Sequence, residues 1–227
     1  LYSGNSYLMT ANQDTPSTSS LPLIKNRFDG YLPVVVDVET SGVDPNKNAL
    51  LELAAVTVDY NESGVMTPSE DNYSTHVLAF EGATINEKAL KINNIDPFHP
   101  FRFAIEEEKA LDGLFDYVDK ALKSTGCRRA LLVGHNAHFD LSFIRAAMKR
   151  CKIKDSPFHA FTVFDTATLG GAFLGKTILA KAIKAAGISF SKDEAHSALY
   201  DTQKTAELFC HIINKVDSHP EKANAKA

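Results

Sequence analysis

The chain has 227 residues, of which 44% are hydrophobic and 23% are charged, a composition that fits one globular domain with a sizeable core. Its formal net charge of −4 argues against a protein that coats nucleic acid through overall positive charge, but allows an enzyme that grips one short end. No apolar run reaches the roughly eighteen residues of a membrane helix and no secretory signal is recognisable, so we expect a cytoplasmic protein. The three cysteines are widely separated, which disfavours a disulfide framework or a zinc knuckle.

The two ends of the chain differ in composition from its body. Residues 1–20 are rich in Ser, Thr, Asn and Gly, and we interpret them as a flexible leader or an added remnant. Residues 217–227 have no apolar stripe and are expected to form a polar tail. The sequence therefore predicts one folded domain over residues 21–216.

Strands are expected first along this domain. The β-branched apolar run YLPVVVDVET predicts a strand over 31–40, and LLELAAVTVDY predicts a second over 50–60. The alternating segment YSTHVLAF predicts a third strand over 73–80.

Helical spacing dominates the rest of the domain. It predicts a helix from residue 106 that stops near Gly126, then a short strand within 128–136 and an amphipathic helix over about 139–150. Two more helices are expected, over 177–187 and about 197–216. This order indicates an α/β domain in which helices flank a mixed β-sheet.

Asp37 and Glu39 lie two residues apart in the first predicted strand. Side chains alternate along a strand, so both carboxylates project from the same face. Two buried like charges need compensation, and a divalent cation with oxygen ligands would supply it. The alternative is an exposed strand end with two solvated acids.

Asp140 follows a predicted strand and lies at the beginning of the amphipathic helix. It could contribute a third carboxylate to the same site. It could also be an ordinary residue of a helix N-terminus, where acidic side chains are favoured by capping and by the helix dipole.

His196 precedes Asp201 by five residues at the opening of the last predicted helix. Five residues is not a same-face helical spacing, so the two side chains meet only if His196 lies in the preceding loop. Each residue taken alone could be an ordinary surface group. Three such motifs, each at a strand end or a helix start, instead favour one acidic catalytic site.

The three motifs are DVE at 37–39, NAHFD at 136–140 and HSALYD at 196–201, and they resemble those of the DEDDh exonucleases. Longer segments, among them DVETSG and AHSALYDTQKTAELF, are similar to the ribonuclease T-like branch of that family, over roughly 27–215. The resemblance implies a ribonuclease H-like fold in a single domain. It also implies a 3′-to-5′ exoribonuclease that hydrolyses single-stranded 3′ ends of tRNA and other stable RNAs, with single-stranded DNA ends as a further substrate.

The resemblance further implies two Mg²⁺ ions in each site, and Mn²⁺ is an alternative because hard oxygen ligands suit both. Asp37 is expected to bridge the ions. Glu39 and Asp201 would complete one coordination shell, and Asp140 would reach the other ion. His196 is expected to be the general base that removes a proton from the attacking water.

Asp165, in the segment VFDTAT, is a further acid within the resemblance. It could buttress the site from outside the metal ligands. It could equally cap the helix that follows it.

The same resemblance suggests that Phe139 and Phe161 stack on the terminal bases, although either ring could instead pack in the core. This sequence departs from the family at three positions of the expected binding site. Val43 and Ile92 replace expected aromatic residues, and Lys88 replaces an expected acid. Aliphatic side chains lack a flat π-face, so discrimination between terminal bases is expected to change.

Ribonuclease T-like enzymes are homodimers in which a basic patch of one subunit feeds RNA into the other's site, and this chain is expected to share that arrangement. The candidate patch residues are Arg27, Lys123, Arg128, Arg129 and Lys154. Scattered basic residues are also typical of a solvated surface. Two other functions stay open: a DNA proofreading exonuclease subunit, and a catalytically inactive nucleic-acid-binding relative.

Overall fold

The computed structural model describes residues 22–191 and 193–218, and the predicted leader and most of the predicted tail lie outside these ranges. The sheet has five strands: β1 (Tyr31–Thr40), β2 (Leu50–Tyr60), β3 (Met66–His76), β4 (Arg129–Gly134) and β5 (Phe158–Asp165). The helices are α1 (Ile24–Arg27), α2 (Glu87–Asn93), α3 (Glu107–Thr125), α4 (His138–Arg150), α5 (Thr166–Leu174), α6 (Leu179–Ala185) and α7 (Ala198–Asp217).

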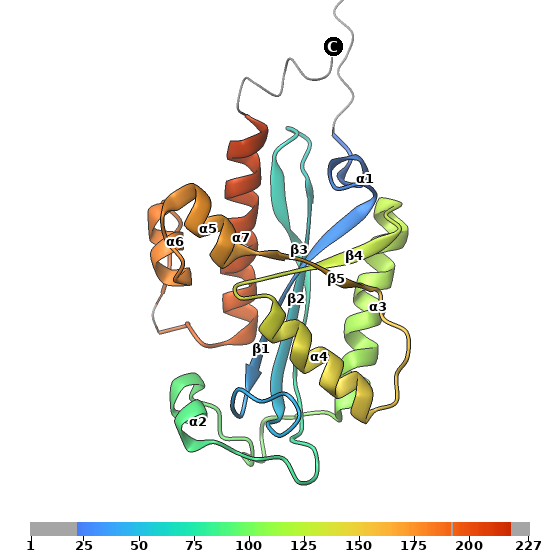
Figure 1. The fold of residues 1–227 in the computed structure, drawn as a ribbon, viewed down its shortest axis with the longest axis vertical. Coiled ribbons are helices and arrows are strands. Elements are labelled where there is room, and N and C mark those ends of the chain that lie inside the picture. Colours follow the sequence, from blue (N-terminus) through green and yellow to red (C-terminus); the bar gives the residue numbers. More distant parts are fainter. Residues whose placement is uncertain (1–21, 192, 219–227) are drawn as a thin grey trace, which may run out of the picture.

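The strands form one mixed sheet in the order β3-β2-β1-β4-β5. The first three strands pair antiparallel, whereas β4 pairs parallel with both β1 and β5. Figure 1 shows α7 along one side of the sheet, with α5 and α6 beside it, and α3 and α4 along the other. The α/β domain with a mixed sheet flanked by helices is therefore confirmed, and β1 is its central strand.

Burial explains why the strongest sequence patterns form these elements. β1 is packed on both sides, so its valines at 34, 35 and 36 are almost fully buried. α3 buries an apolar stripe and ends at Gly126, whose φ of 67° is the left-handed conformation that glycine adopts without strain. Among residues 22–191 and 193–218, no helix combines the length and the apolar character needed to cross a bilayer.

Three differences from the sequence-based expectations concern the sheet and the chain around it. The third strand runs over 66–76, not 73–80, because β3 is an edge strand whose polar, exposed residues hide its start. β5, α1, α2 and α5 were not predicted as elements. α7 extends one residue past the predicted domain end, to Asp217, which forms an ion pair with Arg27 at 3.0 Å.

Candidate active site

The central strand carries the first two acids. Asp37 and Glu39 lie on one face of β1, and Glu39 is opposite Glu52 of β2 in the antiparallel register. Burial, followed by repulsion from Asp140 and Glu39, raises the pKa of Asp37 well above its usual value. Burial raises the pKa of Glu39 to about 8, although a hydrogen bond from Asn93 opposes the rise. The strand thus holds two carboxylates that resist ionisation without a cation.

Asp140 enters the site from the first turn of α4 and is only 3% exposed. Its Oδ1 accepts a hydrogen bond of 3.1 Å from the backbone N–H of Val38, between the two acids of β1. Burial raises its pKa to about 8, against the hydrogen bonds that its carboxylate accepts. Gly134 permits this close approach, because a Cβ there would lie 3.0 Å from Ala137 Cα and 3.1 Å from Asp140 Oδ2.

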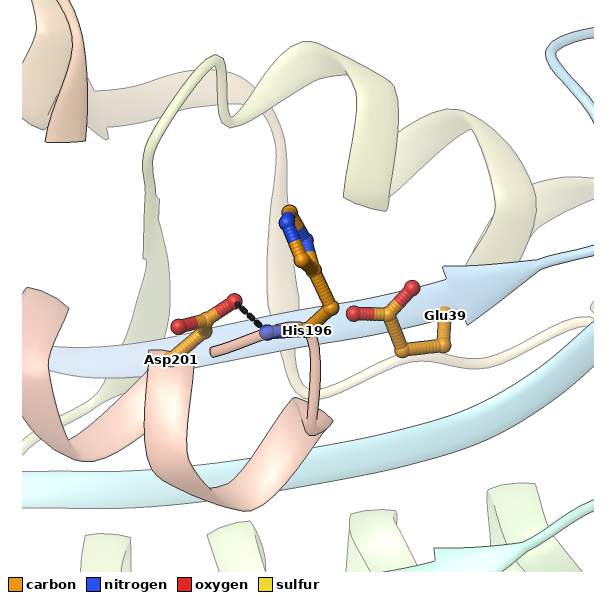
Figure 2. Close-up of side chains that lie close together, drawn as sticks. All are labelled: Glu39, His196 and Asp201. Atoms are coloured by element: carbon orange, nitrogen blue, oxygen red, sulfur yellow. Dashed lines mark hydrogen bonds between the residues drawn. The ribbon is translucent and has the colours of Figure 1, made fainter. Parts of the chain in front are cut away.

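Asp201 and His196 come from the N-terminal end of α7 and the loop before it. His196 has a left-handed backbone with φ of 68°, and its N–H donates to Asp201 Oδ2 at 3.0 Å. Figure 2 shows the imidazole rising between Glu39 and Asp201, and potential ligand atoms of these three residues lie within 4.8 Å of one another. His196 lies in the loop before α7, as the sequence predicted. This position lets His196 meet Asp201 despite the five-residue spacing between them.

The charge balance of this cluster fits a divalent cation. None of the ion pairs formed within 22–191 and 193–218 involves Asp37, Glu39, Asp140 or Asp201. Burial also raises the pKa of Asp201, whose Oδ1 is buried without a hydrogen-bond partner among the described residues. An oxygen left in this state is costly unless a cation or water reaches it. The residues present therefore suit a hard metal ion with oxygen ligands.

Two further polar residues border the acids and were missed from the sequence. The Glu52 carboxylate contacts His76 Nδ1 at 3.1 Å and accepts from Ala198 N–H at 3.3 Å, which joins β2 to the start of α7. The side chain of Asn93 donates to Thr40 O at 3.1 Å and also bonds Glu39. Glu52 is an acid within the apolar run 50–56 of its predicted strand, and that contrast could have identified it.

Asp165 lies at the end of β5, where it caps α5 by accepting hydrogen bonds from Ala167 N–H and Thr168 N–H. Its Oδ1 also accepts from Asn136 N–H, in the turn before α4, at 3.2 Å. The helix-cap alternative is therefore confirmed. The second bond ties the cap to the turn that leads to Asp140.

The residues expected to contact the terminal bases differ in exposure. Phe139 is half-buried and packs on the core ring of Phe143, with 5.0 Å between centroids, so part of its role is structural. Phe161 on β5 is 80% exposed. Val43, Ile92 and Lys88 are also exposed, Val43 beyond the end of β1 and the other two on α2. Four of these five side chains are thus open to solvent.

The basic residues expected to form an RNA-binding patch differ in how far their side chains are already engaged within the protein. Arg27 is engaged with Asp217, and Arg129 donates to the carbonyl oxygens of Ser156 and Phe158. The guanidinium of Arg128 lies 4.4 Å from the centre of the Tyr31 ring. Lys123 and Lys154 are exposed.

A ribonuclease H-like fold whose central strand presents a carboxylate cluster defines the class of nucleases that use divalent metal ions. Residues 34–209 match the family model described as Exonuclease. The chain belongs to this family. It is a 3′-to-5′ exonuclease, a hydrolase of phosphodiester bonds.

Known proteins share both its sequence and its fold. The chain is 54% identical to Ribonuclease T of Vibrio parahaemolyticus over 193 residues, 85% of this chain and 90% of the relative. It is 51% identical to Ribonuclease T of Yersinia enterocolitica over 197 residues, 87% and 91% of the two chains. The solved nuclease domain of 3′hExo, a DEDDh family member bound to rAMP, is 14% identical with a TM-score of 0.58, over 82% of this chain and 90% of that one.

Proposed function

We propose that this chain trims the single-stranded 3′ ends of RNA, including tRNA and other stable RNAs, with Mg²⁺ as its metal. One observation carries the proposal: four acids from three separate segments converge with raised pKa values, and one of their oxygens is buried without a partner. The RNA substrate follows the relatives, which are named Ribonuclease T and align with 85% or more of this chain.

Asp37, Glu39, Asp140 and Asp201 would hold two Mg²⁺ ions, with Mn²⁺ as a substitute. The ions would polarise the scissile phosphate and offset its charge. His196 would take the proton from the attacking water, because its exposed ring lies beside Glu39 and Asp201 and imidazole is the commonest general base in enzymes.

The exposed Phe161, Val43, Ile92 and Lys88, with the accessible part of Phe139, would contact the terminal nucleotides. We also propose a homodimer in the cytoplasm, by likeness to the family. Arg128, Lys123 and Lys154 are the least engaged residues of the patch that would guide RNA between subunits, while Arg27 and Arg129 would contribute less because their guanidinium groups are already occupied.

Digestion of matched 3′-labelled and 5′-labelled single-stranded RNA and DNA with Mg²⁺ tests the proposal. Wild-type protein should shorten RNA stepwise from the 3′ end, and Asp37→Ala should abolish shortening. The control is Glu62→Ala, an exposed acid in the β2–β3 turn, which should act as wild type. Faster shortening of DNA than of RNA would favour a DNA exonuclease. A protein of similar fold, Exonuclease I of E. coli, has been solved in complex with a dT13 oligonucleotide. No shortening of either polymer would favour an inactive binding protein.

A further inference from the structure

The loop between α2 and α3 exposes three large aromatic rings that the site described above does not use. We call residues 94–106 the aromatic loop. Phe98, Phe101 and Phe103 within it are 77%, 73% and 83% exposed. Three large exposed apolar side chains within six residues make this loop a candidate interaction site.

The aromatic loop is held in a defined shape. The Phe98 N–H donates to Asp96 Oδ1 at 3.0 Å, and the Phe101 N–H donates to His99 Nδ1 at 3.2 Å. Phe103 has a left-handed backbone with φ of 51°, an unfavourable conformation for a bulky residue. The loop thus keeps its rings in solvent at a cost in backbone energy, which favours a binding role.

The aromatic loop is fastened to the strands that carry the acids. It begins after Asn93, which bonds Glu39 and Thr40 O, and Arg102 Nη2 donates to Leu51 O at 2.7 Å, one residue before Glu52. Figure 1 shows α2 and the chain that follows it at the end of the sheet where the β1 arrow terminates.

A groove of about 460 Å³ joins the loop of His196 to the start of the aromatic loop. It is lined by His196 and Glu52 at the catalytic end and by Asn94 and Ile95 at the foot of the aromatic loop. The loop that carries the rings therefore contributes its first two residues to a groove that also contains His196.

The chemistry of the aromatic loop suits bases better than a protein surface. Neither Phe98 nor Phe103 joins a ring pair or a cation–π contact among the described residues, so their faces are open. The exposed Lys88 and Lys91 lie on α2, the helix that leads into the loop. Open rings beside positive charge are the usual means of holding a single strand, whereas lysine is depleted from protein interfaces.

We infer that Phe98, Phe101 and Phe103 form a stacking platform for bases of the single-stranded nucleic acid whose 3′ end occupies the acidic site. The inference rests on the proposed function. It assigns this chain an aromatic surface of its own, in the loop that begins two residues after the exposed Ile92.

The test measures the affinity of a 5′-labelled single-stranded RNA of about ten nucleotides by fluorescence anisotropy. Asp37→Ala protein is the background, so that the probe survives. Replacing the three phenylalanines by alanine should weaken binding at least ten-fold, and replacing them by leucine should weaken it nearly as much. Tyrosine in all three positions should restore most of the affinity, because it keeps the ring.

Val65→Ala is the matched control, since Val65 is exposed just beyond the opposite end of β2 and should not affect affinity. Unchanged affinity in the alanine variant would overturn the inference, and so would full affinity in the leucine variant. A dimer that falls apart on alanine substitution, seen by light scattering, would assign the rings to a second copy of the chain instead. Failure of the proposed function would appear separately, as wild-type protein that does not shorten RNA.

Discussion

Replacing Glu39 with glutamine should stabilise the metal-free protein at neutral and alkaline pH. Burial raises the pKa of Glu39 from 4.5 to about 8. Because the folded pKa is the higher one, ionisation costs stability: the cost is absent below pH 4.5, grows as pH rises, and is complete above pH 8. At about 1.4 kcal/mol for each pKa unit the upper bound is about 5 kcal/mol. Partial exposure of the carboxylate lowers the expected gain to about 2 kcal/mol.

Urea unfolding in EDTA at pH 5 and pH 8 measures this gain. Glu39→Gln should match wild type closely at pH 5 and exceed it at pH 8. Saturating Mg²⁺ should stabilise wild type, by about 2.7 kcal/mol at a hundred times Kd, but stabilise the variant much less. Glu62→Gln, which alters an exposed acid, serves as the control. A variant less stable than wild type in EDTA at pH 8, or a gain equal at both pH values, would refute the electrostatic reasoning.

Three further outcomes are expected. His196→Ala should lower the rate of 3′ shortening by about 10²–10⁴-fold while Mg²⁺ still raises the melting temperature; equal loss of both would place His196 among the ligands. Asp201→Asn keeps an oxygen for the His196 N–H but removes a charge, so the titrated Mg²⁺ requirement of the exonuclease should rise about ten-fold or more; an unchanged requirement would exclude Asp201 as a ligand. Arg150→Met should lower the free energy of unfolding in urea by about 3 kcal/mol, because it leaves the Glu107 carboxylate buried without its partner; Glu107 is 6% exposed and paired with Arg150 at 2.7 Å. Adding Glu107→Gln should recover part of that stability, and no recovery would contradict the ion-pair explanation.

The sequence predicted the elements whose burial leaves a periodic pattern. β1 and β2 coincide with the predicted ranges, and α3 and α4 fall within two residues of theirs, since each buries a continuous strand or one helical stripe. β3 was misplaced because an edge strand needs only one partner and tolerates polar residues. β5 escaped prediction because most of its side chains are at least partly exposed.

Residues of the candidate site could be predicted from the sequence only where a motif lies beside a strand end or a helix start. Asp37, Glu39 and Asp140 met that condition, and the structure brings them together with Asp201. Asn93 could not be found, because its contact with Glu39 depends on how α2 docks beyond the end of β1. The exposure of the three phenylalanines in the aromatic loop could not be predicted either, because exposed loop residues follow no periodic pattern in the sequence.

The central place of β1 also bears on how the molecule opens. The strand is hydrogen-bonded to β2 on one side and to β4 on the other, so its amides exchange with solvent only when most of the sheet separates. His196 belongs to an exposed loop that can move without disturbing this ladder. If His196 is the proton acceptor that we propose, thermal fluctuation would displace it more readily than it displaces Asp37 and Glu39 on the central strand.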